Sequence, residues 1–347
     1  MNVALTGGTG FLGQALLRGA RPAGVQVRAL VRRAADQPLL RTLDAEPVRG
    51  DLADADGAVN FVRPGDTLIH AAARVDVIGT AVEYRRGTVD TTRHLLDAAL
   101  PQRPARVVYI SSAAVYTSRP DPADSTGFAA GRTPTTPARW NRYGRAKLAA
   151  ERLVQERCAA AGVPWTIVRL GFLYGPGNHT LARQLCDLQQ RQQLLLVGRG
   201  DNRIATLYID DAADGVWRAA TAPAAAGRIY DLASDEAVTQ AEFIGAHARA
   251  LGLPPVARHV PTWLARFGGA ASEVIAGLLR QRPVFSRMMV ALMAADQRVD
   301  NSAAQADLGW HAATPFADGV ARFAAWWAGQ QAGAPSAAAV AGGSPGA

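Results

Sequence analysis

The sequence predicts an α/β fold, in which a doubly wound parallel sheet is joined to a smaller, mainly helical C-terminal portion. Three observations predict it. Short apolar runs alternate with segments of helix-like spacing up to about residue 170, a glycine-rich turn follows the first apolar run, and the alternation loosens after about residue 171. Strands that alternate with helices form parallel sheets, because each crossover connection lays a helix on a face of the sheet.

The strands and helices of the first portion follow from the spacing of apolar residues. Runs rich in Val, Ile and Leu that stop at turn residues predict buried parallel strands at 2–5, 25–31, 67–70, 106–110 and 165–169. Apolar residues three and four positions apart predict helices at 11–18, 88–100 and 142–161. We therefore expect a first domain over residues 1–170.

The second portion, residues 171–330, has shorter and less regular elements. Strands are expected at 207–209 and 229–232 and a helix at 240–251, and the stretch of about 205–235 is expected to return to the first domain. Residues 331–347 contain mostly Ala, Gly, Ser and Pro, which predicts a disordered tail.

Composition narrows the class of protein. With 49% hydrophobic and 19% charged residues, the 347-residue chain is typical of globular proteins. It lacks an apolar run of about eighteen residues and an N-terminal signal pattern, so we expect a cytoplasmic protein without a membrane span. The net charge of +8 is spread along the chain, which argues against nucleic acid as a partner. The two cysteines, Cys158 and Cys186, predict neither a disulfide framework nor a metal site.

A glycine-rich turn at residues 6–13 predicts a cradle for phosphate. Gly7, Gly10 and Gly13 lie between the first strand and the first helix, where they permit a tight turn, close approach of a pyrophosphate and close packing of helix on strand. The N-terminus of the helix directs free N–H groups at the phosphates. The pattern predicts a Rossmann-type dinucleotide site, with these contacts: Gly7, Thr9, Gly10, Phe11, Leu12 and Gly13.

The end of the second strand indicates which nicotinamide cofactor is bound. NAD enzymes normally carry an acidic residue there, whereas this strand runs into Arg32 and Arg33. A guanidinium can bind a 2′-phosphate through two donors, so we expect NADP(H) to be preferred and NAD(H) to be possible. The alternative is that both are ordinary surface arginines. Asp51, with Leu52 beside it, is a candidate contact to the adenine.

Tyr143 and Lys147 are predicted to handle the proton of a hydride-transfer reaction. They are four residues apart at the start of a long helix and therefore share a face. Lys147 is the only lysine in the chain. Its ammonium, helped by the charge of the oxidised nicotinamide, is expected to lower the pKa of the phenol. Ser112, at the end of a strand, is expected to hold the substrate oxygen, with Ser111 as the second choice.

Together these motifs resemble the extended short-chain dehydrogenase/reductase family over nearly all of residues 1–328. They are the glycine cradle, Gly50 with Asp51, residues 69–73, 111–116, Tyr143 with Lys147, Arg169, 174–177 and 208–211. Residues 69–79 are similar to the 3β-hydroxysteroid dehydrogenase branch. The resemblance implies Ser112, Tyr143 and Lys147 as the catalytic triad, a C-terminal portion that shapes the substrate pocket, and a homodimer.

The resemblance also bears on residues around the cofactor. His70, Ala71, Ala72 and Ala73 are expected to line its site, although a packed, hydrogen-bonded role for His70 is the alternative. Many relatives have proline after the arginine at 169, near the nicotinamide, where this chain has Leu170. Animal steroid enzymes often carry a membrane segment and an acid at the second-strand tip, and this chain lacks both patterns. A steroid substrate is therefore left open.

Three functions are weighed. The first is redox chemistry between an alcohol and a ketone on a small hydrophobic substrate. The apolar segment 261–295 favours such a substrate over a sugar, although core packing or a dimer contact is the alternative for this segment. The second is nucleotide-sugar epimerisation or dehydration, but Ile204 stands where such enzymes usually place a diphosphate-binding arginine, and Arg203 faces the other way on a strand. The third is a non-catalytic NADP sensor. Residues 261–295 could also contact a membrane surface peripherally.

Overall fold

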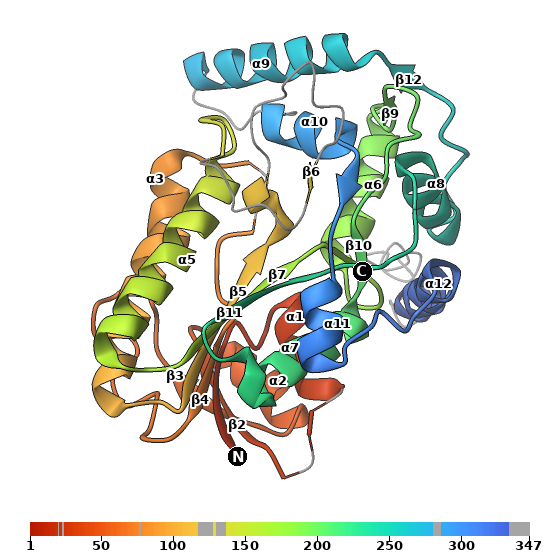
Figure 1. Cartoon of the computed structure of the whole chain (residues 1–347). Coiled ribbons are helices and arrows are strands. Elements are labelled where there is room, and N and C mark those ends of the chain that lie inside the picture. Colours follow the sequence, from red (N-terminus) through yellow and green to blue (C-terminus); the bar gives the residue numbers. More distant parts are fainter. Residues whose placement is uncertain are drawn as a thin grey trace, which may run out of the picture.

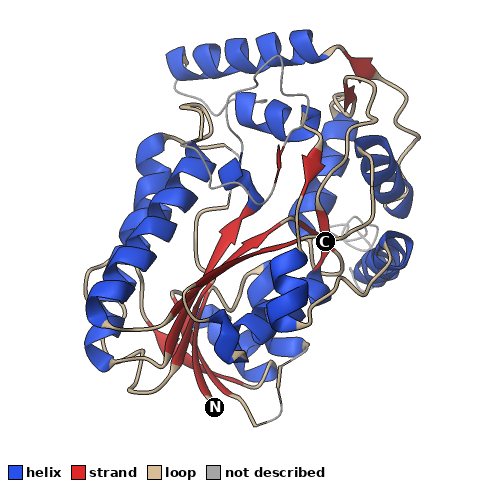
Figure 2. Cartoon of the chain, viewed as in Figure 1, coloured by secondary structure: helices blue, strands red, loops and turns tan. Residues whose placement is uncertain are grey.

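The computed structural model describes residues 1–19, 21–22, 24–75, 78–116, 128–129, 137–279 and 286–332, with backbone alone at 128, 129 and 277. It confirms the predicted α/β class. A twisted sheet has helices on both faces, and the C-terminal portion lies beyond one end of the sheet (Figures 1 and 2). Residues 76–77, 117–127 and 130–136 are among those that fall outside the described residues.

The main sheet has seven strands in the order β11-β7-β5-β4-β1-β2-β3, and every neighbouring pair is parallel. The strands are β1 (Asn2–Thr6), β2 (Gln26–Val31), β3 (Ala45–Arg49), β4 (Thr67–His70), β5 (Arg106–Ser112), β7 (Trp165–Leu170) and β11 (Arg228–Leu232). The chain runs outward from β1 to β3 and then returns to β4 on the other side of β1. Ligands of such sheets bind where the order reverses, at the carboxyl ends of β1 and β4.

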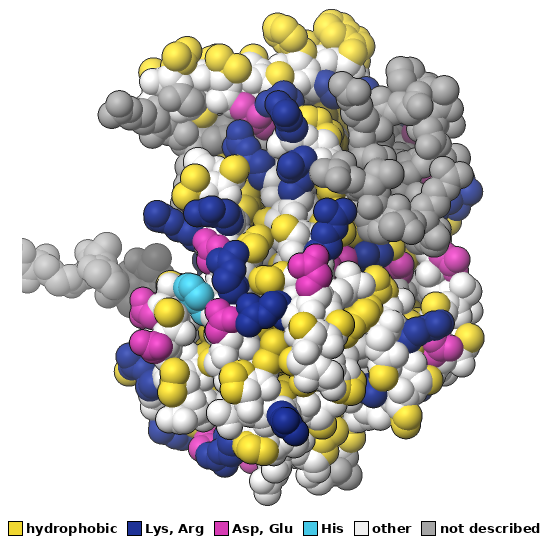
Figure 3. Space-filling model, turned by 60° about the vertical axis from the view of Figure 1, so that its left-hand side comes forward, with side chains coloured by type: hydrophobic (Ala, Val, Ile, Leu, Met, Phe, Trp, Pro, Cys, Tyr) yellow, Lys and Arg dark blue, Asp and Glu magenta, His cyan; other side chains and the backbone are white. Residues whose placement is uncertain are grey.

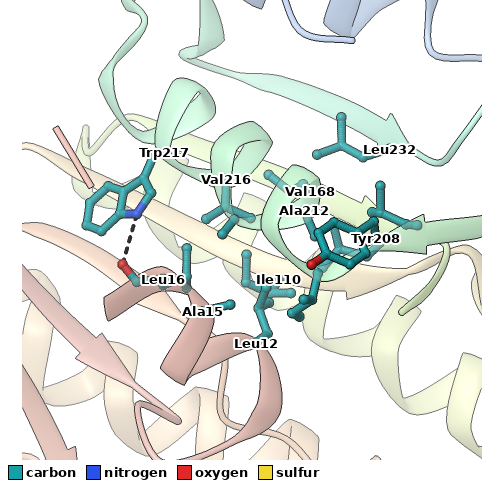
Figure 4. Close-up of a cluster of buried hydrophobic side chains, with 14 of the residues drawn as sticks. Leu12, Ala15, Leu16, Ile110, Val168, Tyr208, Ala212, Val216, Trp217 and Leu232 are labelled. Atoms are coloured by element: carbon teal, nitrogen blue, oxygen red, sulfur yellow. Dashed lines mark hydrogen bonds between the residues drawn. The ribbon is translucent and has the colours of Figure 1, made fainter. Parts of the chain in front are cut away.

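One face of the sheet is covered by α1 (Phe11–Arg18), α2 (Gln37–Thr42), α7 (Ile209–Thr221) and α11 (Ser302–Leu308). Figure 4 shows the centre of this layer, where Leu12 and Leu16 of α1 meet Val216 of α7 over the strands. The Trp217 indole donates a hydrogen bond of 3.1 Å to the Leu16 carbonyl. This contact connects α7, which comes 200 residues later in the chain, to the helix that follows the glycine cradle.

The other face is covered mainly by α4 (Thr91–Ala99) and α5 (Arg142–Ala161), whose apolar side chains pack on β4, β5 and β7. The helix expected at 88–100 differs at its start. A short helix, α3 (Ala81–Tyr84), and a π-helical turn, η2 (Arg85–Asp90), precede α4. Thr80 and Glu83 form a capping box that fixes the beginning of α3. This arrangement buries Tyr84 beside the start of α5.

The C-terminal portion is mainly helical. Its helices are α6 (His179–Gln190), α8 (Gln240–Ala250), α9 (Thr262–Leu278), α10 (Arg287–Ala294) and α12 (Phe316–Ala332). Three short parallel pairs accompany them: β8 (Phe172–Tyr174) with β10 (Thr206–Tyr208), β9 (Leu196–Val197) with β12 (His259–Val260), and β6 (Phe128–Ala129) with β13 (Gln297–Arg298). A strand was expected at 207–209. The strand instead ends at Tyr208, and Ile209 begins α7. In the described part of the chain, no helix combines the length and apolar character that crossing a bilayer requires.

Candidate active site

The glycine cradle has the geometry that a bound pyrophosphate needs. Gly7 has a φ of +75°, and a Cβ there would lie 2.9 Å from the backbone of Ala71 and Ala72. A Cβ on Gly13 would lie 2.0 Å from the Gly7 carbonyl oxygen, so only glycine lets α1 approach the turn this closely. No described side chain caps α1, and its first turn carries no acid. Free N–H groups and a positive helix end therefore remain for an anion, and the residues fit a dinucleotide.

The other predicted cofactor contacts of the cradle differ in how deeply they are buried. Thr9 and Phe11 are half-buried, whereas Leu12 is buried in the core between α1 and the sheet. The Leu12 side chain thus packs inward, which leaves its backbone N–H as the group at the helix N-terminus.

His70 is packed and hydrogen-bonded, as in the alternative considered for it. Its ring nitrogens contact Thr6 Oγ1 at 2.7 Å and Thr92 Oγ1 at 3.0 Å, and the residue is 2% exposed. Burial, with a smaller effect from nearby Lys147, lowers the pKa of His70 to about 3, so the ring is neutral. Thr6 also accepts hydrogen bonds from the N–H groups of Ala71 and Ala72. The ring holds the strand ends around the cradle together and is not free to bind a ligand.

The structure distinguishes the two arginines after β2. Both are exposed, but Arg33 donates two hydrogen bonds of 2.8 and 2.9 Å to the Asp36 carboxylate. Arg32 forms no ion pair or hydrogen bond with any residue in the described part of the chain. On the neighbouring loop, Asp51 accepts a hydrogen bond from the Ala53 N–H, and Leu52 is buried. Arg32 is therefore the guanidinium that stays available at this edge.

The start of α5 is built against the segment that follows β5. Asn141 caps the helix by accepting a hydrogen bond from the Gly144 N–H at 2.8 Å, and its amide donates to the Ala114 carbonyl at 2.9 Å. A Cβ on Gly144 would lie 2.4 Å from the same carbonyl oxygen. The close contact brings Tyr143 beside Ser112, which precedes η4 (Ala113–Tyr116).

Lys147 is buried at 3% exposure with its ammonium held at the end of β5. Nζ donates a 2.8 Å hydrogen bond to the Ile110 carbonyl and lies 5.0 Å from the centre of the Tyr109 ring. Burial lowers the pKa of Lys147 to about 8, and the carboxylate of Glu151 opposes that decrease. The side chain is thus charged at neutral pH but close to its titration point.

Burial dominates the acidity of Tyr143 in this structure. It raises the pKa of the phenol, and a hydrogen bond with Ser112 opposes this rise. The lowering expected from the ammonium and the oxidised nicotinamide together concerns the cofactor complex, and here Lys147 donates to the Ile110 carbonyl. The Tyr143 ring lies 6.2 Å from that of Tyr84, centre to centre. The phenol is therefore protonated at neutral pH in this structure.

The two strand-end serines have different partners. Ser111 is buried and donates a 2.5 Å hydrogen bond to Glu151, whereas Ser112 is half-buried and lies by Tyr143. Successive side chains of a strand point to opposite faces, so one serine faces α5 and the core and its neighbour faces the site.

Sequence reasoning missed a buried polar network behind this site. Glu151 accepts hydrogen bonds from Arg169 Nε at 3.0 Å and Nη2 at 2.6 Å. Arg169 Nη1 donates to the Tyr116 hydroxyl at 2.7 Å, which donates to Asp231 at 2.6 Å. Burial raises the pKa of Asp231 to about 6. Glu151 follows Lys147 by four residues, and this spacing was the one visible signal.

Several predicted substrate and cofactor contacts lie elsewhere. Leu170 is 4% exposed and packs in the core at the end of β7. Ile204 is buried and Arg203 is exposed, but the strand expected there begins only at Thr206. The apolar segment 261–295 is divided: Met288 is buried, Val284 and Phe285 lie outside the described residues, and the large apolar side chains of α9 project outward. Those of α9 were expected to suit an apolar ligand, with core packing as one alternative, and their exposure excludes core packing.

Comparison with known proteins gives the following. Residues 3–233 match the model of the NAD dependent epimerase/dehydratase family. A 2-alkyl-3-oxoalkanoate reductase of Stenotrophomonas maltophilia is 30% identical over 94% of this chain and 99% of its own. A 3 beta-hydroxysteroid dehydrogenase/Delta 5→4-isomerase of Mycobacterium tuberculosis is 30% identical over 70% of this chain and 67% of its own. The solved structure of MoeE5 with UDP-glucuronic acid and NAD has a TM-score of 0.71 and 25% identity, covering 95% and 100% of the two chains.

Proposed function

The chain belongs to the NAD dependent epimerase/dehydratase family, and from this premise we propose that it reduces a ketone on a small hydrophobic substrate to a secondary alcohol with NADPH. The resemblance to extended short-chain dehydrogenases, with relatives among 3β-hydroxysteroid dehydrogenases and reductases, is confirmed. The chain is accordingly an NAD(P)-dependent oxidoreductase. The finer proposal is supported by the position of Tyr143 beside Ser112 at the carboxyl end of β5, with the ammonium of Lys147 held by the Ile110 carbonyl of the same strand.

The residues divide the work of ketone reduction as follows. The cofactor, when bound, supplies a hydride to the carbonyl carbon. Ser112 holds the ketone oxygen by a hydrogen bond, and the Tyr143 phenol gives that oxygen its proton, which completes the alcohol. The Lys147 ammonium, near the phenol on the same helix face, stabilises the negative charge left on Tyr143 until solvent returns a proton. At neutral pH the phenol is protonated, as proton donation to the ketone oxygen requires.

The cradle glycines, the α1 N-terminus and the backbone of residues 71–73 would hold the pyrophosphate side of the cofactor, and Asp51 the adenine. The free guanidinium of Arg32 supports NADP(H), since a 2′-phosphate needs a cation that no carboxylate already occupies. Arg33 is a weaker candidate, because Asp36 engages it through two hydrogen bonds.

Two observations support a hydrophobic substrate over a sugar nucleotide. Sugar-nucleotide enzymes of the family usually carry an arginine that binds the substrate diphosphate. This chain has the buried, uncharged Ile204 at that position. The relative from Stenotrophomonas maltophilia is named for reducing a 2-alkyl-3-oxoalkanoate, and the match covers almost all of both chains. Hence a β-keto acid with alkyl chains is the substrate class to test first.

The test is an assay of NADPH and NADH oxidation with 2-alkyl-3-oxoalkanoates, ketosteroids and UDP-sugars. We expect turnover with the first class, and a Tyr143→Phe variant that binds NADPH normally but loses about 10²–10⁴-fold in kcat. Tyr230→Phe serves as the control, because Tyr230 is a buried tyrosine outside this site whose hydroxyl bonds Asp307. Turnover of UDP-sugars alone, or full activity in Tyr143→Phe, would show the proposal to be wrong.

A further inference from the structure

Helix α9 carries an exposed apolar surface that packing of the protein does not explain. We call it the α9 face: Trp263, Leu264, Phe267, Val274, Ile275 and Leu278 of the helix, together with Leu279 directly after it. These are seven of the thirteen large apolar side chains that are exposed among the described residues, and Trp263, Phe267 and Leu278 are 71%, 69% and 79% exposed. The other six are scattered singly over the molecule. A concentration of this kind on one short element marks a contact surface.

The α9 face is one-sided. With 3.6 residues per turn, its seven members fall within an arc of about 160°, and no charged residue of the helix lies in that arc. The opposite side carries the buried small residues Gly269 and Ala276, through which the helix packs on the body. Figure 3 shows hydrophobic side chains gathered along the top of the molecule, the end at which Figure 1 places α9.

The charges that border the α9 face are positive. Arg266, on the flank of the helix, is exposed and pairs with no residue in the described ranges. Arg258, just before β12, is exposed and forms a hydrogen bond with the Gln192 carbonyl but no ion pair with a described acid. The one acid of the helix, Glu273, is neutralised by Arg287 at 2.9 Å. The border therefore repels a second copy of itself and attracts a negatively charged surface.

We propose that α9 docks this enzyme on an anionic lipid membrane, lying in the plane of the interface. The α9 face enters the acyl boundary, with Trp263 and Phe267 as anchors, while Arg266 and Arg258 reach the lipid phosphates. At 17 residues the helix lies on the bilayer and does not cross it. The proposal does not depend on the reaction catalysed. It places the carboxyl ends of the sheet strands, which point toward this end of the molecule (Figure 1), on the membrane side.

The test is flotation of the full chain with vesicles of phosphatidylcholine alone and of an equimolar mixture of phosphatidylcholine and phosphatidylglycerol. We expect binding to the mixed vesicles that weakens as salt is added. The double variant Trp263→Ser, Phe267→Ser should bind about tenfold more weakly or worse. Its matched control, Leu39→Ser with Val59→Ser, replaces exposed apolar residues elsewhere and should bind as the native chain does.

The charge contribution is tested separately. Arg266→Gln should weaken binding to the mixed vesicles about fivefold, and Arg152→Gln, an exposed arginine of α5, should leave it unchanged. Should the double variant fold poorly, quenching of native tryptophan fluorescence by brominated lipid, reduced in Trp263→Phe, reports the same contact. The proposal is overturned if the native chain binds neither kind of vesicle, or if the double variant binds as well as the native chain. It is also overturned if the native chain is a dimer that binds no vesicle and the double variant is a monomer.

Discussion

Replacing Glu151 by Gln should destabilise the protein far more than a change of one atom suggests. The carboxylate is 1% exposed in its ion pair with Arg169, which is 5% exposed. It accepts three hydrogen bonds, two from Arg169 and one from Ser111. An amide keeps the volume but turns an N–H donor toward one of these donors and leaves the guanidinium charge without its main counter-ion.

The magnitude follows from burial. Breaking a buried ion pair by removing one partner costs about 3–5 kcal/mol, against a typical total stability of about 5–15 kcal/mol. The chain offers a matched control in Arg157 and Asp97, which are also 2.6 Å apart but are 40% and 48% exposed. Because solvent screens that pair, Asp97→Asn should cost no more than about 1 kcal/mol.

Urea unfolding followed by circular dichroism measures the free energy of unfolding of both variants. Their m-values should match that of the native chain, so that midpoints compare stability directly. Equal losses in Glu151→Gln and Asp97→Asn would refute the reasoning, because the two pairs differ in burial and not in length.

Three further outcomes are expected. The ketone-reduction rate should fall as pH rises through about 8, because burial lowers the pKa of Lys147 to that value and the ammonium is lost above it. Lys147→Arg should abolish this fall. A fall that persists in Lys147→Arg contradicts the role given to the Lys147 ammonium. Arg32→Ser should raise KM for NADPH at least about tenfold and leave KM for NADH unchanged. The control is Arg191→Ser, which replaces an exposed arginine of another segment and should change neither KM. Equal effects of Arg32→Ser on both cofactors would reject the contact to the 2′-phosphate. Stability should fall as pH drops below 6.5, because burial lowers the pKa of His70 to about 3 and of His247 to about 4, so the unfolded chain takes up protons that the folded chain refuses. Each ring contributes about 1.4 kcal/mol per pH unit, urea unfolding across pH measures the slope, and an unchanged slope in His247→Asn would count against it.

The sequence alone predicted most of the strands and helices within residues 1–170. Elements α1 and α5 have the bounds that apolar spacing indicated, because each helix must turn one stripe toward the sheet. The cradle was equally visible, since its glycines are dictated by backbone contacts within a few residues. Strand β3 was missed because its sequence, Ala-Glu-Pro-Val-Arg, is half polar at the edge of the sheet.

Local spacing determined which residue types gather at the carboxyl ends of the strands, and therefore the class of chemistry. The tertiary structure decided what each of them does there. Which of Arg32 and Arg33 stays free depends on the position of Asp36, which serine faces Tyr143 depends on the twist of β5 against α5, and the acidity of the phenol depends on how deeply it is buried. The tertiary structure also decided that the large apolar side chains of α9 are exposed. The periodicity of a sequence reveals that a helix has an apolar face, but not whether the rest of the protein covers that face.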